Sequence, residues 1–163
     1  MKKIITLIGV LVALCAGTLG AQTSASKASF NREFKDASRE NWEKVTDKIS
    51  LVRFSHESKS SIAYFKNSGE LLMSGKLIEL SESPEAVQAG IDALAKSVLK
   101  RDGALRVTQV FELTEQGATK YYVNMGNEKV YIAVLANSKG KTSIIKRSKL
   151  DPNKNQEPVI AAK

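Results

Sequence analysis

The only cysteine of the chain, Cys15, lies inside a segment that is typical of an export signal. Lys2 and Lys3 precede an almost wholly apolar run over residues 4–15, and small residues follow up to Ala21. A basic start, a short apolar run and a small-residue cleavage site are the three parts of a secretory signal peptide. Cleavage near Ala21 would remove the thiol. The exported chain could then form no disulfide and no thiolate metal site, so its fold must be held by its core alone.

Export places the protein in the periplasm or outside the cell, with residues 1–21 as the signal peptide. The apolar run is shorter than the roughly 20 residues that span a bilayer, so no stable membrane insertion is expected after cleavage. A lipid anchor on Cys15 is the less favoured alternative, because bulky Leu14 precedes it. The remaining residues suit one domain, predicted over 28–149. Residues 150–163 contain two prolines and no periodicity, which predicts a disordered tail.

The first half of the chain is predicted to form a short helical region and three strands. Residues 22–27 are a polar lead-in, and a broken helix is predicted over residues 28–44. Asp36 is the expected N-cap of a second short turn that carries Trp42. Alternating or β-rich runs then predict strands over residues 49–56, 61–66 and 71–80.

The second half begins with the clearest amphipathic helix. Ser83 is its expected N-cap, Pro84 its first helical residue, and Asp102-Gly103 its end. Its apolar face repeats at spacings of four, three and four residues: Val87, Ile91, Leu94 and Val98. Four short strands within residues 105–147 follow, and their short turns predict an antiparallel meander.

The two halves form a weak internal repeat. Each half is a helix followed by three or four antiparallel strands. Asn67-Ser68-Gly69 corresponds to Asn137-Ser138-Lys139-Gly140, in each case between two strands. The predicted fold class is therefore α+β, with an antiparallel sheet packed against helices in two weakly repeated halves.

This layout resembles the PepSY-like, β-lactamase-inhibitor-like periplasmic proteins of Bacteroidetes. The resemblance covers roughly residues 28–147 and rests on these segments: Phe34-Lys35-Asp36-Ala37 leading to Trp42, Phe54, Ala63-Tyr64-Phe65 to Gly69, Pro84, and Tyr121-Tyr122-Val123. It implies a helix-plus-antiparallel-sheet fold and a non-catalytic role in the envelope. It does not imply β-lactamase inhibition, because one fold hosts many functions.

No catalytic, metal or cofactor site is predicted. His56, the only histidine, lies among polar residues with no second histidine or thiol to complete a metal site, so a solvated loop residue is favoured. No Gly-x-Ser-x-Gly motif supports a serine hydrolase. Three acidic residues, Glu79, Glu82 and Glu85, cluster before the helix, where its dipole attracts carboxylates without any bound cation.

Two tyrosines are candidate partner-binding residues. Tyr122 and Tyr131 fall out of phase with their apolar neighbours, which places them on the outer face of the sheet beside Lys120 and Lys129. Such a face could bind a protein or a glycan. Burial of the strands on both sides is the alternative.

The last hairpin carries a basic run that includes Lys139 and Lys141 within a chain of formal net charge +8. The run could bind anionic envelope polymer, or it could protect an edge strand from aggregation. Nucleic acid is not expected as a partner, since the exported chain has no binding motif for it. The leading hypothesis is an exported binding module that contacts an envelope protein through its sheet face. An inhibitor of an envelope hydrolase and adsorption to anionic polymer are the alternatives.

Overall fold

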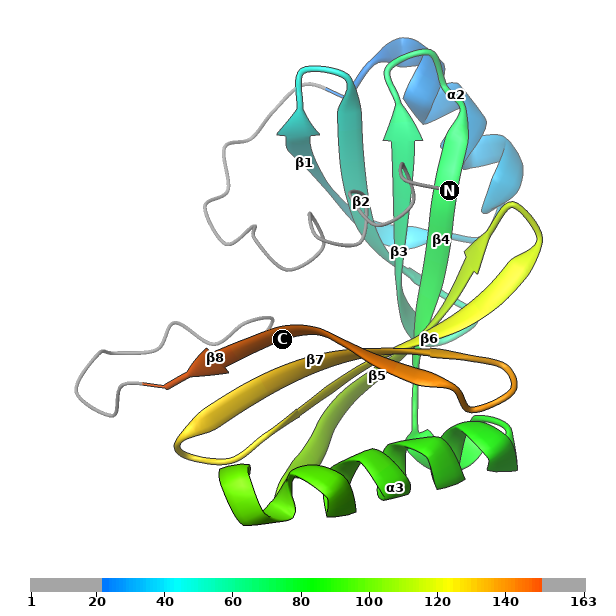
Figure 1. Ribbon diagram of the computed structural model, residues 1–163. Coiled ribbons are helices and arrows are strands. Elements are labelled where there is room, and N and C mark those ends of the chain that lie inside the picture. Colours follow the sequence, from blue (N-terminus) through cyan, green and yellow to red (C-terminus); the bar gives the residue numbers. More distant parts are fainter. Residues whose placement is uncertain (1–21, 151–163) are drawn as a thin grey trace. The chain divides into compact units, whose positions relative to one another are not determined.

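The computed structural model describes residues 22–150, which contain two α-helices and eight strands (Figure 1). The expected signal peptide and tail lie outside the described residues. The strands form an antiparallel sheet whose order follows the chain from β1 to β8. The α+β fold class is confirmed. The contacts divide the chain after Ser74 into two compact units, called unit 1 and unit 2.

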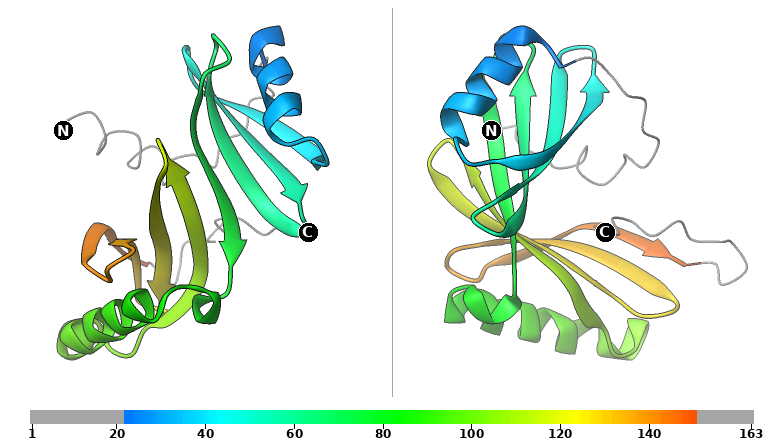
Figure 2. Two further views of the ribbon diagram at one scale, coloured as in Figure 1. Left: turned by 90° about the vertical axis from the view of Figure 1, so that its right-hand side faces the viewer. Right: turned by 180° about the vertical axis from the view of Figure 1, so that it is seen from behind.

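Unit 1 contains one helix and four strands: α2 (Ser24–Glu33), β1 (Ser38–Thr46), β2 (Ile49–His56), β3 (Lys59–Lys66) and β4 (Leu71–Ile78), whose last residues belong to unit 2. The helix covers one face of these strands (Figure 2). Its buried residue Phe30 contacts four other rings, with centroids 4.9 to 6.3 Å away: Phe34, Trp42, Phe54 and Phe65. Unit 1 is thus held by an aromatic cluster, which buries a large area per side chain.

The start of unit 1 differs from the prediction. Residues 24–27 are helical, because the Thr23 hydroxyl caps α2 by accepting a hydrogen bond from the backbone N–H of Ser26 at 3.1 Å. Trp42 lies in strand β1, and Asp36 caps no second turn. The sequence pattern of β1 did not predict a strand, because most residues of this edge strand are exposed and do not alternate with apolar ones. The strand forms by pairing with β2, and such a contact between segments is not visible in a local pattern.

Unit 2 repeats the layout with a longer helix. After the 3-10 turn η1 (Leu80–Glu82), it contains α3 (Glu85–Asp102), β5 (Arg106–Glu115), β6 (Ala118–Gly126), β7 (Val130–Asn137) and β8 (Thr142–Lys149). Val87, Ile91 and Val98 are buried against aliphatic residues of the strands, as their spacing predicts. The two repeated halves and the meander of four strands are both present.

The beginning of α3 is one residue later than predicted. The carbonyl of Pro84 accepts the first helical hydrogen bonds, from the backbone N–H groups of Val87 and Gln88, so Pro84 is the N-cap. The Ser83 hydroxyl instead donates to the carbonyl oxygen of Leu80 at 2.6 Å. A serine beside a 3-10 turn can bond backward as well as forward, and the sequence does not distinguish the two.

The repeated turns have the same role in both units. Gly69, between β3 and β4, and Gly140, between β7 and β8, have φ of +89° and +78°. A Cβ added to Gly69 would lie 2.8 Å from the carbonyl oxygen of Ala25 in α2, and one added to Gly140 would overlap the carbonyl of Ala86 in α3. Glycine therefore lets each turn pack directly on the first turns of its helix.

Candidate functional site

The candidate site belongs to unit 2, whose sheet has α3 on one face only. We call the other side the second face. Tyr121 and Met125 pack in the core under α3, so their neighbours Tyr122 and Asn124 lie on the second face, as does Tyr131 of β7. Both tyrosines therefore lie on the face of the sheet opposite α3, as their position out of phase with the apolar residues predicts.

A chain of hydrogen bonds orders the middle of the second face. The Tyr131 hydroxyl donates to Oδ1 of Asn124 at 2.6 Å, and Nδ2 of Asn124 donates to Oε1 of Gln109 at 3.1 Å. The Tyr122 hydroxyl lies 3.3 Å from that of Tyr131. Burial raises the pKa of Tyr131, so its hydroxyl stays a protonated donor at neutral pH.

Tyr122 is only 3% exposed, whereas Tyr131 is half-buried. For Tyr122 the alternative of burial on both sides of the strand therefore holds, and its ring is not a free contact surface. Tyr131 remains a candidate for contact with a partner.

The four candidate lysines do not form one patch. Nζ of Lys120 lies 2.7 Å from Oε2 of Glu115, so this lysine is engaged within its own hairpin. Lys129 lies in the β6–β7 turn, whereas Lys139 and Lys141 lie in the β7–β8 turn at the opposite end of β7. All three of these are exposed.

Strand β8 is the most exposed element of the sheet in unit 2. It is the last strand in the order of the described sheet, so one of its edges has no partner strand there. Its Ile144 and Ile145 are 40% and 36% exposed. A register shift between Ala133 and Val134 of β7 makes Ile145 the extra residue of a β-bulge.

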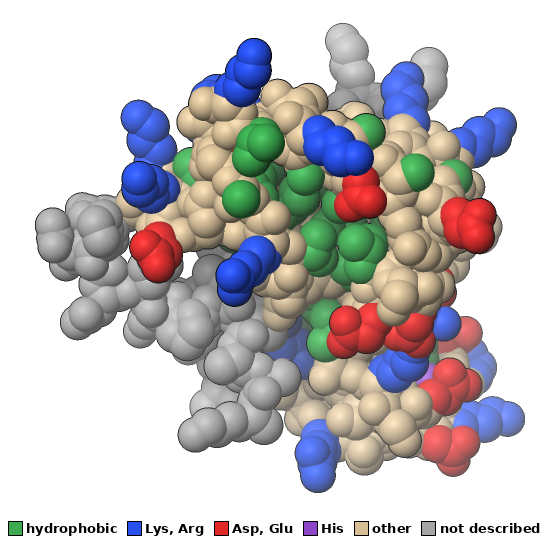
Figure 3. Space-filling model, turned by 90° about the horizontal axis from the view of Figure 1, so that it is seen from below, with side chains coloured by type: hydrophobic (Ala, Val, Ile, Leu, Met, Phe, Trp, Pro, Cys, Tyr) green, Lys and Arg blue, Asp and Glu red, His purple; other side chains and the backbone are tan. Residues whose placement is uncertain are grey.

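All charged residues of β8 and of the turn before it are cations. Residues 138–149 include five cations and no acidic residue: Lys139, Lys141, Lys146, Arg147 and Lys149. Figure 3 looks at the α3 side of the molecule, where Lys and Arg side chains are interspersed with acidic ones. The β8 segment therefore differs from the mixed surface on the α3 side.

A buried ion pair ties β8 to the end of α3. The Asp102 carboxylate has no exposed area and accepts hydrogen bonds from Arg147 of β8 and, at 3.0 Å, from Nη2 of Arg101. The hydrogen bond from Arg147, which has the larger effect, and that from Arg101 hold the pKa of the Asp102 carboxyl below its usual range. Sequence reasoning missed the pair of Asp102 and Arg147, because these residues are 45 positions apart.

A cavity of about 600 Å³ opens beside this ion pair. Its walls are the loop of residues 101–104 and the turn of residues 126–129, and Arg106 of β5 lines it as well. The size is within the range of small-molecule sites. Of the candidate partner-binding residues predicted from the sequence, only Lys129 lines it.

The remaining candidates have structural roles. His56 ends β2 and packs edge-on against the ring of Phe34, with centroids 5.7 Å apart, so it is not the solvated loop residue that we expected. Oε2 of Glu82 accepts the backbone N–H of Glu79 at 2.8 Å and closes the η1 turn. Within residues 22–150 no group of acidic, histidine or cysteine side chains is arranged to hold a metal ion.

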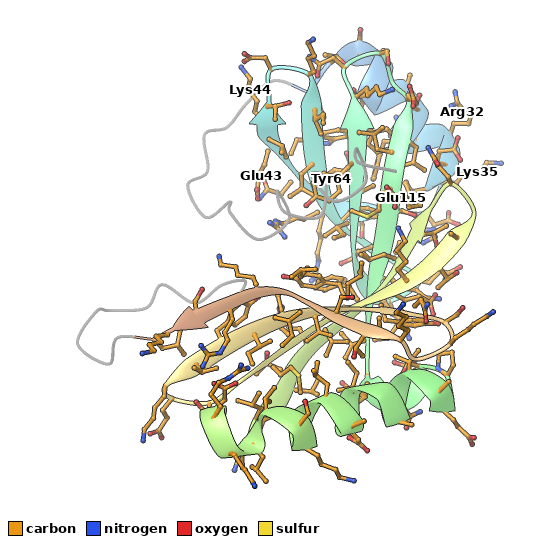
Figure 4. All side chains as sticks on the ribbon, in the orientation of Figure 1. Arg32, Lys35, Glu43, Lys44, Tyr64 and Glu115 are labelled. Carbon is orange, nitrogen blue, oxygen red and sulfur yellow. The ribbon has the colours of Figure 1, made fainter. Side chains whose placement is uncertain are left out.

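Unit 1 has an equivalent second face. Phe65 packs under α2, so its neighbour Tyr64 lies on the other side of β3 (Figure 4). Burial raises the pKa of Tyr64. Nearby, Nε of Arg53 lies 2.9 Å from Oε1 of Glu43, so the charges of these two side chains neutralise each other. This arrangement offers no reactive group.

Comparison with known proteins shows the fold. No family model matches the chain, and no curated protein matches it. Among solved structures, a "putative periplasmic" protein from Bacteroides eggerthii is 16% identical with a TM-score of 0.64, covering 80% of this chain and 90% of that one. A DUF2874 family protein from Bacteroides uniformis is 15% identical with a TM-score of 0.62, covering 77% and 88%.

A BLIP-like protein from Bacteroides fragilis is 12% identical with a TM-score of 0.59, covering 84% of this chain and 92% of that one. In the described part of this chain, neither helix has the length and apolar character needed to cross a membrane. The resemblance expected from the sequence is confirmed at the level of the fold, and this chain has the fold of the BLIP-like and DUF2874 proteins of Bacteroides.

Proposed function

We propose that the chain is a non-catalytic protein-binding module of the bacterial periplasm, and that an extended segment of its partner pairs with strand β8. The observation that carries this proposal is the exposure of an edge strand with two adjacent isoleucines. The unpaired N–H and C=O groups of such an edge are a template for one more strand. The predicted signal peptide and the description of the Bacteroides eggerthii protein support the periplasmic location.

Side chains next to the edge fit this role. In the register of β7 and β8, Tyr131 lies opposite Ser148 and Ala133 opposite Lys146, all on the second face. The hydroxyl of Tyr131 is held by Asn124 of β6, so Lys146 and Ser148 of β8 are the second-face side chains that an added strand would meet first.

Charge favours a foreign strand over a second copy of this chain. A second β8 would place cations against cations, which disfavours pairing. A partner segment with acidic side chains would meet complementary charges, and such complementarity raises association rates and selects partners. The partner is therefore expected to present an acidic, extended segment.

Adsorption to anionic envelope polymer is the second candidate, because the same five cations occur without any acidic residue between them. The two functions respond in opposite directions to one substitution. Ile145→Lys adds a cation and removes apolar contact, so it should weaken pairing with a protein strand and strengthen polymer adsorption. Polymer binding should also fall steeply with salt, since exposed charges are screened beyond about 8 Å at 0.15 M.

The test is photo-crosslinking in periplasmic extract, with the crosslinking residue at position 143 of β8. A crosslinker at position 41 of β1, the other edge of the sheet, is the matched control. We expect one defined protein adduct from position 143, none from position 41, and a several-fold lower yield in the Ile145→Lys background. Leu99→Lys, which replaces an exposed leucine of α3, should leave the yield unchanged.

Equal adducts from both edges would contradict the proposal. Stronger retention of Ile145→Lys on an immobilised anionic polysaccharide, together with no adduct from position 143, would support the polymer candidate instead.

A further inference from the structure

We propose that the cavity between the end of α3 and the β6–β7 turn binds a small organic anion that carries a carboxylate or phosphate group. This inference does not require partner binding at β8, and Arg106, on which it depends most, lies on β5, three strands away in the sheet order.

The cavity is built on a fixed frame. Nδ2 of Asn127 donates to the carbonyl oxygens of Asp102 and Ala104 at 2.8 and 3.1 Å. Oδ1 of the same side chain accepts the backbone N–H groups of Lys129 and Val130 at 2.9 and 3.0 Å. One amide thereby joins both walls of the cavity, so the cavity does not depend on a ligand for its shape.

Two glycines keep the walls open. Gly103 has a φ of +76°, and Gly126 lies so close to the β6–β7 turn that an added Cβ would be 2.8 Å from the carbonyl oxygen of Val130. Both residues line the cavity and expose backbone there. A ligand can therefore approach the main chain closely.

The charge inside the cavity is positive. Asp102 is already satisfied by Arg101 and Arg147, so it repels an incoming anion only weakly. Among the described residues neither Arg106 nor Lys129 makes an ion pair. Glu128 is the remaining acidic residue of the lining. An arginine without a partner is suited to bidentate binding of a carboxylate or phosphate.

The end of a helix would normally oppose an anion, because its last carbonyl groups carry partial negative charge. Here the carbonyl of Leu99 accepts the N–H of Gly103 at 2.9 Å, and those of Asp102 and Ala104 are taken by Asn127. Two of the last four helical carbonyl groups, those of Leu99 and Asp102, are thus occupied, which reduces their repulsion of the ligand. A volume of about 600 Å³ exceeds what a single phosphate fills, so the ligand should have a body of the size of a sugar.

The experiment is a titration followed by NMR of the ¹⁵N-labelled protein at constant ionic strength, with three probes of one ring size: glucose 6-phosphate, glucuronate and glucose. We expect saturable shifts at the amides of residues 101–106 and 126–129 with at least one of the two anions and none with glucose. The stronger of the two anions identifies phosphate or carboxylate as the preferred group.

Arg106→Gln should weaken binding about tenfold or more, because an anion loses its charged bidentate partner. Lys100→Gln is the matched control, since Lys100 is an exposed cation of α3 outside the cavity. Equal shifts with glucose, no saturable shifts, or equal losses in both variants would overturn the proposal. Because Arg106→Gln leaves β8 unchanged, crosslinking at position 143 should persist in this variant whether or not the anion binds.

Discussion

The two units share a layout but differ in what holds them together and in how they end. Unit 1 packs a helix of 10 residues through rings, and unit 2 packs a helix of 18 residues through aliphatic side chains. Aromatic residues bury more area each, so a short helix with one central phenylalanine is sufficient in unit 1. The comparison shows that one architecture can be stabilised by two different cores.

The two edge strands, β1 and β8, also differ, in the charges that they carry. Three ion pairs involve β1 and its flanking residues, and they mix both charges: Lys27–Glu40, Arg53–Glu43 and Lys44–Asp47. Strand β8 has cations only, of which Arg147 is paired. Three of the four charged residues of β1 are therefore paired within unit 1, whereas most cations of β8 and its exposed isoleucines remain available to a partner. This difference is why we assign binding to unit 2.

The largest expected effect is that of Phe30→Ala. The substitution leaves four rings of unit 1 without their common neighbour, and large-to-small changes of buried aromatics cost about 3–5 kcal/mol of unfolding free energy. Ile91→Ala in the aliphatic core should cost less, about 2–4 kcal/mol. Chemical denaturation measures both, and a larger loss for Ile91→Ala would reverse our ranking of the two cores.

The next effect concerns the repeated turns. Gly140→Ala should cost about 3 kcal/mol, since it adds a clash with the carbonyl of Ala86 to the strain of a positive φ. Gly117→Ala is the control, because Gly117 has a φ of +77° and nothing within 4 Å of an added Cβ, so only about 1–2 kcal/mol of strain is expected. Similar losses in both variants, measured by thermal unfolding, would show that the turn does not press on α3.

A smaller effect tests the ion pair that ties β8 to α3. The pKa of Asp102 is lowered in the folded protein, so its contribution to stability is complete above its unfolded pKa of about 3.9 and is lost as pH falls through the folded value. Asp102→Asn should lower stability at neutral pH and flatten the decline below about pH 4. Denaturation midpoints of both proteins between pH 2 and 7 provide the measurement. Parallel curves would argue against the assignment.

The smallest effect is expected at an exposed pair of unit 1. Nζ of Lys66 lies 2.5 Å from Oε2 of Glu70, with both side chains about half exposed. Lys66→Gln should change the free energy of unfolding by less than about 0.5 kcal/mol, because such pairs are screened by solvent. A loss comparable to that of Gly140→Ala would mean that surface charges, and not the packed turn and core, stabilise unit 1.

The sequence alone determined the features that depend on neighbouring residues. The spacing of Val87, Ile91 and Val98 defined the face of α3, and out-of-phase Tyr122 and Tyr131 marked the second face of the sheet. The turn repeat at Gly69 and Gly140 was also visible, because a tight turn with positive φ favours glycine locally. These signals depend on residues that are close in the sequence, so they can be recognised without a structure.

Tertiary structure decided what depends on distant residues. Trp42 became part of a strand because β2 pairs with it, and Tyr122 proved to be buried where its pattern allowed exposure. The pairing of Asp102 with Arg147 and the walls of the cavity join segments that no local period connects. Periodicity shows which way a side chain points, but only the packed chain determines what lies opposite it.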